Sequence, residues 1–291
     1  MTFSSLIRFR NLKGKELFGE PEIKHADDLQ SLLGNKALFA VVLDGSSPFD
    51  ITRRTDIREQ VKELLPVLRP KDVPIIKCVG LNYMKHIAEG GRKPPPYPSI
   101  FVKPSASVAG FNEDIQIPKI AQENQLDYEG ELSIVIGKTG KDISKDKALE
   151  YIAGYMTSND MSARTWQRDP AFAGVAPQWC FSKGFDKFAP LGPLLVSPTS
   201  VGDASNLRLQ TWVNDELRQD AETSDLLFGV VDIVSFISQG TTLEKGTVIM
   251  TGTPAGVAMG MKEPMYLSNG DVVKVRIDQL GTVENKMAFQ E

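Results

Sequence analysis

The sequence predicts a β-dominated α+β protein, with a small β-rich N-terminal domain at residues 1–70 and a larger domain at residues 71–291. Most apolar segments are short and end at Gly, Pro, Asn or Asp, which is typical of strands separated by turns. Segments with helical periodicity are few, so the regular strand–helix alternation of a doubly wound fold is missing. The polar stretch RPKDVP at 69–74 separates the two parts of the chain.

In the N-terminal part, LIRFR at 6–10 and ALFAVVL at 37–43 predict strands. TDIREQVKELLPVL at 55–68 has an amphipathic pattern that predicts a helix. We therefore expect a small unit of strands with one helix.

The larger part contains six strand candidates and two helix candidates. NDE at 214–216 predicts a hairpin turn between two strands. The helices are expected at 145–156, after Ser144 as a cap, and at 227–237, before Gly240. The strands are expected at 98–103, 132–136, 193–196, 207–213, 247–251 and 271–277.

Charge and composition exclude several classes of protein. With 291 residues and a net charge of −4, the chain lacks the basic surface of a general nucleic-acid binder. Its two cysteines, Cys78 and Cys180, provide no disulfide framework and favour a reducing compartment. No apolar run approaches the roughly 20 residues of a membrane span. We expect a cytoplasmic protein, with a mitochondrial presequence in the basic first 15 residues as the alternative.

Three carboxylates form the first candidate site. In LDYEGELSIVIGK at 126–138, Glu129 and Glu131 lie two apart and should share one face of a strand. Asp160, in SNDMSARTWQ, provides a third carboxylate from another segment. A divalent cation would relieve their repulsion, and oxygen ligands without His or Cys suit Mg²⁺, Mn²⁺ or Ca²⁺. The alternative is a solvated face of an edge strand.

VGLNYMKHIAEGG contains His86 and, three residues later, Glu89. On a helical turn these side chains are neighbours, so the carboxylate could orient the imidazole as a general base that activates water. The alternative is an ordinary surface pair.

Two further segments offer positive charge and polar groups. Lys183 lies in the apolar stretch QWCFSKGFDKFAPLGP, where a desolvated ammonium could neutralise a substrate carboxylate or enolate. The alternative is a lysine whose stem runs along an apolar edge. In IMTGTPAGV at 249–257, backbone amides and the hydroxyls of Thr251 and Thr253 could hold an anionic oxygen, or the segment is a plain turn.

Seven segments in series resemble the fumarylacetoacetate hydrolase family, over about residues 73–288. Within it, the C-terminal KEPMYLSNGDVVKVRIDQLGTVENK and the preceding domain are most similar to the branch of oxaloacetate tautomerases. The segments are VGLNYMKHIAE, FVKPSAS, LDYEGELSIVIGK, YIAGYMTSNDMSARTWQ, FSKGFDKFAPLGP, VNDELRQ and IMTGTPAGV.

The resemblance implies a mixed β-sandwich roll, a homodimer and a set of site residues. Lys183 matches the family's active-site lysine, and His86 and Glu89 match its water-activating dyad. Gln167 and Thr253 match residues that orient water or substrate. The family's divalent-metal ligands, usually for Mg²⁺, Mn²⁺ or Ca²⁺, match Glu129, Glu131 and Asp160.

We therefore expect a divalent-metal-dependent enzyme that acts on small 2-oxo acids through a metal-stabilised enolate. The favoured reactions are C–C bond hydrolysis of acylpyruvates and related 1,3-dicarbonyl acids, or decarboxylation of oxaloacetate. The alternative is an oxaloacetate keto–enol tautomerase. A third possible class of protein is a binding or scaffold protein without catalytic activity. The expected partners are the small 2-oxo acid and a second copy of the chain, with no nucleic acid and no membrane.

Overall fold

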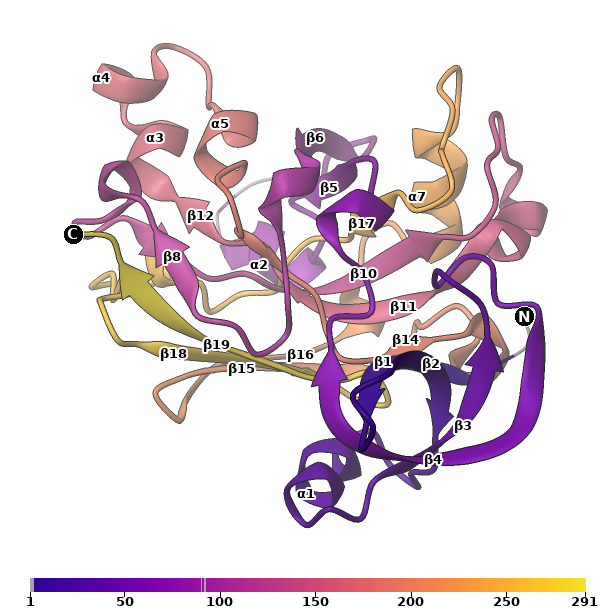
Figure 1. Ribbon diagram of the computed structural model, residues 1–291. Helices are drawn as coiled ribbons and strands as arrows, with labels where there is room; N and C mark the ends of the chain where they lie inside the picture. The colour runs from indigo at the N-terminus through magenta and orange to yellow at the C-terminus, as the bar shows by residue number, and fades with distance from the viewer. Residues whose placement is uncertain (1–2, 90, 92) are drawn as a thin grey trace.

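A computed structural model describes residues 3–89, 91 and 93–291, and for His86 and Glu89 it describes the backbone alone. The chain forms a strand-rich α+β fold in which two large sheets pack face to face (Figure 1). The N-terminal part forms a curled antiparallel unit with one short helix. Its elements are β1 (Ser5–Asn11), β2 (Glu16–Pro21), α1 (Asp28–Gly34), β3 (Phe39–Asp44) and β4 (Arg53–Leu65).

The helix predicted at 55–68 is wrong, because this segment is the long strand β4. β4 pairs with β3 on one side and with β1 on the other, and it bends around the unit in Figure 1. Thr55, Val61 and Leu64 are buried while most of the charged residues between them are exposed. Pairing with neighbouring strands therefore overrides the local helical pattern.

The first sheet of the main part continues directly from this unit. β1 pairs with β14, with Leu6 opposite Leu195, so ten strands form one continuous order, β2-β3-β4-β1-β14-β11-β10-β17-β5-β6. Four of the predicted strands correspond to β6, β10, β14 and β17. The added strands are β5 (Ile76–Gly80), β6 (Ser99–Lys103), β10 (Gly130–Ile136), β11 (Ile152–Asn159), β14 (Leu195–Val196) and β17 (Val248–Met250).

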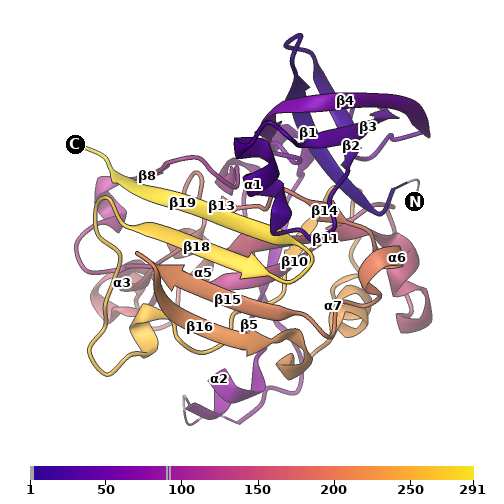
Figure 2. The same cartoon turned by 90° about the horizontal axis from the view of Figure 1, so that it is seen from below.

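The second sheet has the order β16-β15-β18-β19-β8, and Figure 2 shows it from below. The predicted hairpin joins β15 to β16, and Asn214 and Asp215 make its turn with positive φ angles of 49° and 66°. The strands are β8 (Ile115–Ile117), β15 (Arg208–Val213), β16 (Glu216–Glu222), β18 (Val272–Ile277) and β19 (Gly281–Phe289).

The core lies between the sheets, and every residue of β10 and β11 is buried. The predicted helix at 145–156 is wrong in its second half: a 3-10 turn, Lys145–Tyr151, leads directly into β11. The other predicted helix is confirmed as α7 (Val230–Ile237).

Short elements surround the two sheets. The remaining strands form two small pairs, β7 (Val108–Ala109) with β13 (Ala189–Pro190), and β9 (Leu126–Asp127) with β12 (Ser162–Ala163). Within the described ranges, no helix is both long enough and apolar enough to cross a membrane. The other helices are α2 (Met84–Glu89), α3 (Arg164–Arg168), α4 (Pro170–Ala173), α5 (Trp179–Lys183) and α6 (Pro198–Val201).

Candidate metal and active site

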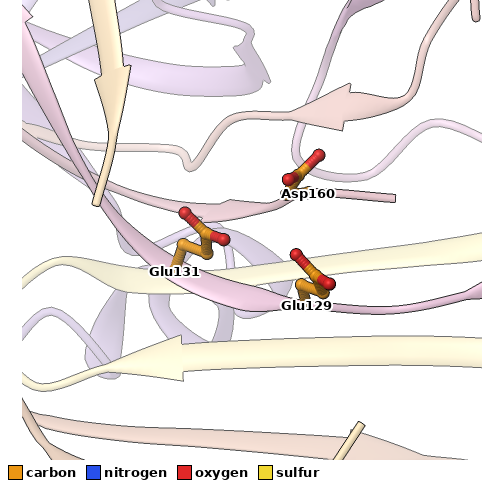
Figure 3. A group of neighbouring side chains, drawn as sticks. All are labelled: Glu129, Glu131 and Asp160. Carbon is orange, nitrogen blue, oxygen red and sulfur yellow. The ribbon is translucent and has the colours of Figure 1, made fainter. Parts of the chain in front are cut away.

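The three predicted carboxylates meet at one end of the β10–β11 pair. Glu129 directly precedes β10, Glu131 is its second residue, and Asp160 directly follows β11. The backbone N–H of Asp160 donates to the carbonyl of Glu129 over 2.8 Å, which fixes the two ends beside each other. One carboxylate oxygen from each side chain lies within 4.8 Å of the others, and Figure 3 shows the three groups facing a common space.

Burial excludes the alternative of a solvated edge strand. β10 lies inside the sheet between β11 and β17, and Glu131 and Asp160 are 2% and 0% exposed. Buried carboxylates are costly unless a cation compensates them.

Lys183 provides part of that compensation. From the end of α5 its ammonium donates to Glu129 Oε2, Asp160 Oδ2 and Ser162 Oγ, each over 2.7 Å. Its side chain is 3% exposed, so it is not a lysine that runs along an edge into water. The structure thus brings this predicted residue into contact with two of the three carboxylates.

Arg164 is a second buried cation that the sequence reasoning did not select. Its Nε donates to Asp127 Oδ2 over 2.8 Å, and one terminal nitrogen donates to Glu129 Oε1 over 2.6 Å. The other terminal nitrogen donates to Gln167 Oε1 over 3.0 Å, which holds this predicted residue at the site. Asp127 lies in the same motif as Glu129, and Arg164 lies in the same motif as Asp160. Their places in these two motifs were the sequence feature that could have identified them.

Lys103 is the third buried cation, and it was also missed. It is 0% exposed, and its ammonium donates to Asp160 Oδ1 over 2.5 Å and to the carbonyl of Phe188. The signal lay in β6, where Ile100 and Val102 point outward and the residues between and after them point inward. Alternation in this strand places a lysine in the core.

The charges shift the carboxyl pKa values in opposite directions. Burial disfavours the charged form of Glu129, but Lys183 and Arg164 outweigh it and lower its pKa to about 2. Burial, together with the charges of Asp160 and Glu129, holds the pKa of Glu131 well above its usual value. An ionised Glu131 therefore needs additional positive charge, and the all-oxygen set fits a hard divalent cation.

The predicted TGTP loop closes the site beside Glu131. The N–H of Gly252 donates to Glu131 Oε2 over 2.7 Å. Gly252 has a φ of +100°, and a Cβ there would lie 2.9 Å from the carbonyl oxygen of Val79, so this position requires glycine. The hydroxyl of Thr251 donates to Leu132 O over 3.0 Å and that of Thr253 to Gly130 O over 2.9 Å. Both hydroxyl protons are therefore used within the protein, and binding an anionic oxygen through them would require these bonds to change.

A cavity of about 260 Å³ opens from the carboxylates. Four predicted site residues besides Glu131 line it: Glu129, Gln167, Lys183 and Thr253. The rings of Phe101 and Trp179 form an apolar wall, and their centroids lie 5.2 Å apart. The arrangement can hold a small anion next to a charged ammonium.

The side chains of His86 and Glu89 lie outside the described part of the structure. Their backbone belongs to α2, which the fully buried Tyr83 and Ile87 anchor to the core. Their role as a water-activating dyad stays a prediction.

The model of the family described as fumarylacetoacetate (FAA) hydrolase C-terminal matches residues 75–288. The chain belongs to the fumarylacetoacetate hydrolase family. Among curated proteins of this family, it is 40% identical over 230 residues to a mitochondrial oxaloacetate tautomerase of Rattus norvegicus. The matched segment covers 79% of this chain and 70% of the rat protein. It is 38% identical over 232 residues to an oxaloacetate tautomerase of Bacillus subtilis, over 78% of this chain and 73% of that protein.

Solved structures of this family share the whole architecture, including the N-terminal unit. A 2-hydroxyhepta-2,4-diene-1,7-dioate isomerase from Mycobacterium marinum matches with a TM-score of 0.78 and 32% identity, over 99% of both chains. A fumarylacetoacetate hydrolase from Exiguobacterium antarcticum matches with a TM-score of 0.78 and 34% identity, over 98% of this chain and 99% of that one. The strand-rich α+β fold expected from the resemblance is thereby confirmed.

Proposed function

We propose that this protein is a divalent-metal-dependent keto–enol tautomerase of a small 2-oxo acid, with oxaloacetate as the substrate. The observation that carries the proposal is the convergence of Glu129, Glu131 and Asp160 beside the buried ammonium of Lys183. The names of the rat and Bacillus relatives support tautomerisation over the other reactions of such a site.

Tautomerisation moves a proton between carbon 3 and the carbonyl oxygen, and negative charge lies on that oxygen after the proton has left carbon 3 and before the oxygen is protonated. When bound by the three carboxylates, a divalent ion such as Mg²⁺ supplies a Lewis acid for this charge. Burial opposes the charge of Lys183, but Asp160 and Glu129 keep its pKa above the usual value, so it is an ammonium at neutral pH. Its charge is therefore present wherever the enolate oxygen lies beside it.

Other residues of the cavity bind and orient. Arg164 donates to the side-chain oxygen of Gln167 and so fixes this side chain. The amide nitrogen of Gln167 is then available to contact the substrate in the cavity. Thr253 also lines the cavity, and the amide of Gln219 holds it by donating to its hydroxyl over 2.8 Å. We assign the proton transfer at carbon 3 to His86, with Glu89 as its orienting partner.

Hydrolysis and decarboxylation, the reactions that the sequence favoured, have weaker support than the tautomerase alternative. All three reactions use the same electron sink. Hydrolysis also needs a water molecule activated at carbon 4, whereas tautomerisation needs only a proton transfer. The location of the protein, cytoplasmic or mitochondrial, stays a prediction, and the rat relative is named as mitochondrial.

The test is a comparison of three reactions with the Mg²⁺-loaded protein. Enol-oxaloacetate decay, pyruvate release from oxaloacetate, and acetylpyruvate loss are followed under one set of conditions. We expect fast enol decay with little pyruvate release. Fast loss of acetylpyruvate with enol decay at the uncatalysed rate would refute the tautomerase and restore the hydrolase.

A variant pair adds a structural check. Lys183→Met should reduce enol decay at least 100-fold, because removing one preorganised donor to developing charge costs roughly 10²–10³ in rate. Lys147→Met, at an exposed surface lysine, should leave the rate unchanged. Equal rates in the two variants would remove Lys183 from the mechanism.

A further inference from the structure

The cavity extends past the carboxylates to a wall that contains a further arginine. Arg168 lines this cavity together with Met259, Gly260 and Met261. It ends α3, the helix that Arg164 begins. Residues four apart lie on one face of a helix and about 6 Å apart along its axis. Because Arg164 reaches Glu129, Arg168 is placed one turn farther from the carboxylates on the same face.

A buried carboxylate fixes the wall against which Arg168 lies. Asp127 accepts from the N–H groups of Ala258 and Met259 over 2.9 and 3.1 Å, and from Arg164 over 2.8 Å. A terminal nitrogen of Arg168 lies 3.3 Å from the sulfur of Met259. The loop that carries this methionine and the helix that carries both arginines are therefore tied to the same anchor.

Charge balance indicates what the wall would bind. The described groups around the site that are buried or nearly buried comprise four carboxylates and three cations, so a bound divalent ion would leave one net positive charge. The carboxylate of a 2-oxo monoacid neutralises it. A second carboxylate on the substrate would then have no counterion among these groups, which are Asp127, Glu129, Glu131 and Asp160 with Lys103, Arg164 and Lys183.

We propose that Arg168 binds the second carboxylate of a short 2-oxo dicarboxylate and makes the site selective for diacids over monoacids. This inference rests on the proposed function for the position of the first carboxylate, and it deepens that function by assigning the other end of the substrate. The planar guanidinium can contact both oxygens of a carboxylate, which a single ammonium does less well. Arg168 is a specificity-determining residue in this scheme, and the proton transfer does not depend on it.

Binding of unreactive ligands tests the assignment apart from turnover. Malate and lactate are 2-hydroxy acids that differ by the second carboxylate, and calorimetry with the Mg²⁺-loaded protein measures both. Arg168→Met should weaken malate binding about tenfold, which corresponds to about 1.4 kcal/mol, and change lactate binding less than twofold. Arg168→Lys should recover part of the malate affinity.

A matched control separates contact from general charge. Lys262 directly follows Met261, is exposed and does not line the cavity. Lys262→Met removes a positive charge from the same loop and should change malate binding less than twofold. An equal effect of the two variants, or an equal loss of malate and lactate affinity in Arg168→Met, would overturn the assignment.

Kinetics distinguish failure of this inference from failure of the proposed function. In Arg168→Met, KM for oxaloacetate should rise about tenfold, and kcat should fall less than threefold. If the wild-type protein does not turn over oxaloacetate, the proposed function fails, and the malate-to-lactate comparison still decides the role of Arg168. If oxaloacetate is turned over with an unchanged KM in the variant, only the assignment of Arg168 is wrong.

Discussion

Replacing Glu131 with glutamine should have opposite effects on the metal-free and the metal-bound protein. Glutamine keeps a side-chain oxygen that can accept from the N–H of Gly252, so the local hydrogen bond survives. It removes a carboxylate whose charge Asp160 and Glu129 oppose and Lys183 favours. Glu131→Gln should therefore stabilise the metal-free protein and remove most of its stabilisation by Mg²⁺.

The size of the first effect follows from the geometry. Two unit charges 4.8 Å apart repel by roughly 3.5 kcal/mol at an effective dielectric constant of about 20. Glu131 has two repulsive partners and one attractive partner, and protonation relieves part of the net repulsion. We expect a gain of about 1–2 kcal/mol in the free energy of unfolding, which corresponds to a rise in Tm of roughly 2–8 °C.

The second effect follows from mass action. At a free Mg²⁺ concentration 100 times its Kd, the wild-type protein gains about 2.7 kcal/mol, or roughly 5–10 °C in Tm. If the loss of one ligand raises Kd about 100-fold, the same Mg²⁺ concentration adds only about 0.4 kcal/mol to the variant.

Thermal unfolding followed by circular dichroism, with EDTA and with Mg²⁺, measures both effects. Glu150→Gln, at a carboxylate that is 57% exposed, is the control and should follow the wild type in both conditions. A lower Tm of the metal-free Glu131→Gln variant, together with an unchanged Mg²⁺-induced shift, would refute the assignment of these carboxylates as a cation site.

Three further outcomes are expected. Lys103→Met should lower the free energy of unfolding of the metal-free protein by about 3–5 kcal/mol in denaturant titrations, because it removes a buried cation that pairs with Asp160. Mg²⁺ should restore part of this stability, and a loss below about 1 kcal/mol would contradict the expected role of Lys103. Arg276 lowers the pKa of Asp27, which is partly exposed. Asp27→Asn should thus cost about 0.5 kcal/mol above pH 5 and nothing once the pH falls below the lowered pKa; a cost that persists in acid would refute the pairing. We expect a homodimer in sedimentation equilibrium, and Val102→Glu, on the exposed face of the edge strand β6, should weaken it if that face is the contact.

The sequence predicted the site better than it predicted the elements that carry it. Glu129 and Glu131 were identifiable because strand alternation is local and places both on one side. Lys103 was missed because its partner Asp160 lies 57 residues away in the chain. Alternation in β6 indicates which residues share a face with Lys103, but which face is buried is known only once the pairing of β6 is known.

Two strands, β4 and β11, lie in segments that the sequence predicted as helical. All of β11 is buried, so it has no alternation of polar and apolar residues, and its apolar residues continue the helical pattern that precedes it. β4 shows the opposite problem, because its charged residues mimic an amphipathic helix until β1 and β3 pair with it. Both errors arise from non-local hydrogen bonding that a window of neighbouring residues does not contain.

The pairing of β1 with β14 has a practical consequence for anyone who shortens this protein. The segment that matches the family model begins at residue 75, yet β14 lies between β1 and β11 in the same sheet. Cutting the chain there would bare the backbone of β14 and uncover Leu195, and open apolar edges promote aggregation. A fragment chosen by family boundaries alone should therefore precipitate, although it would retain every residue assigned here to the reaction.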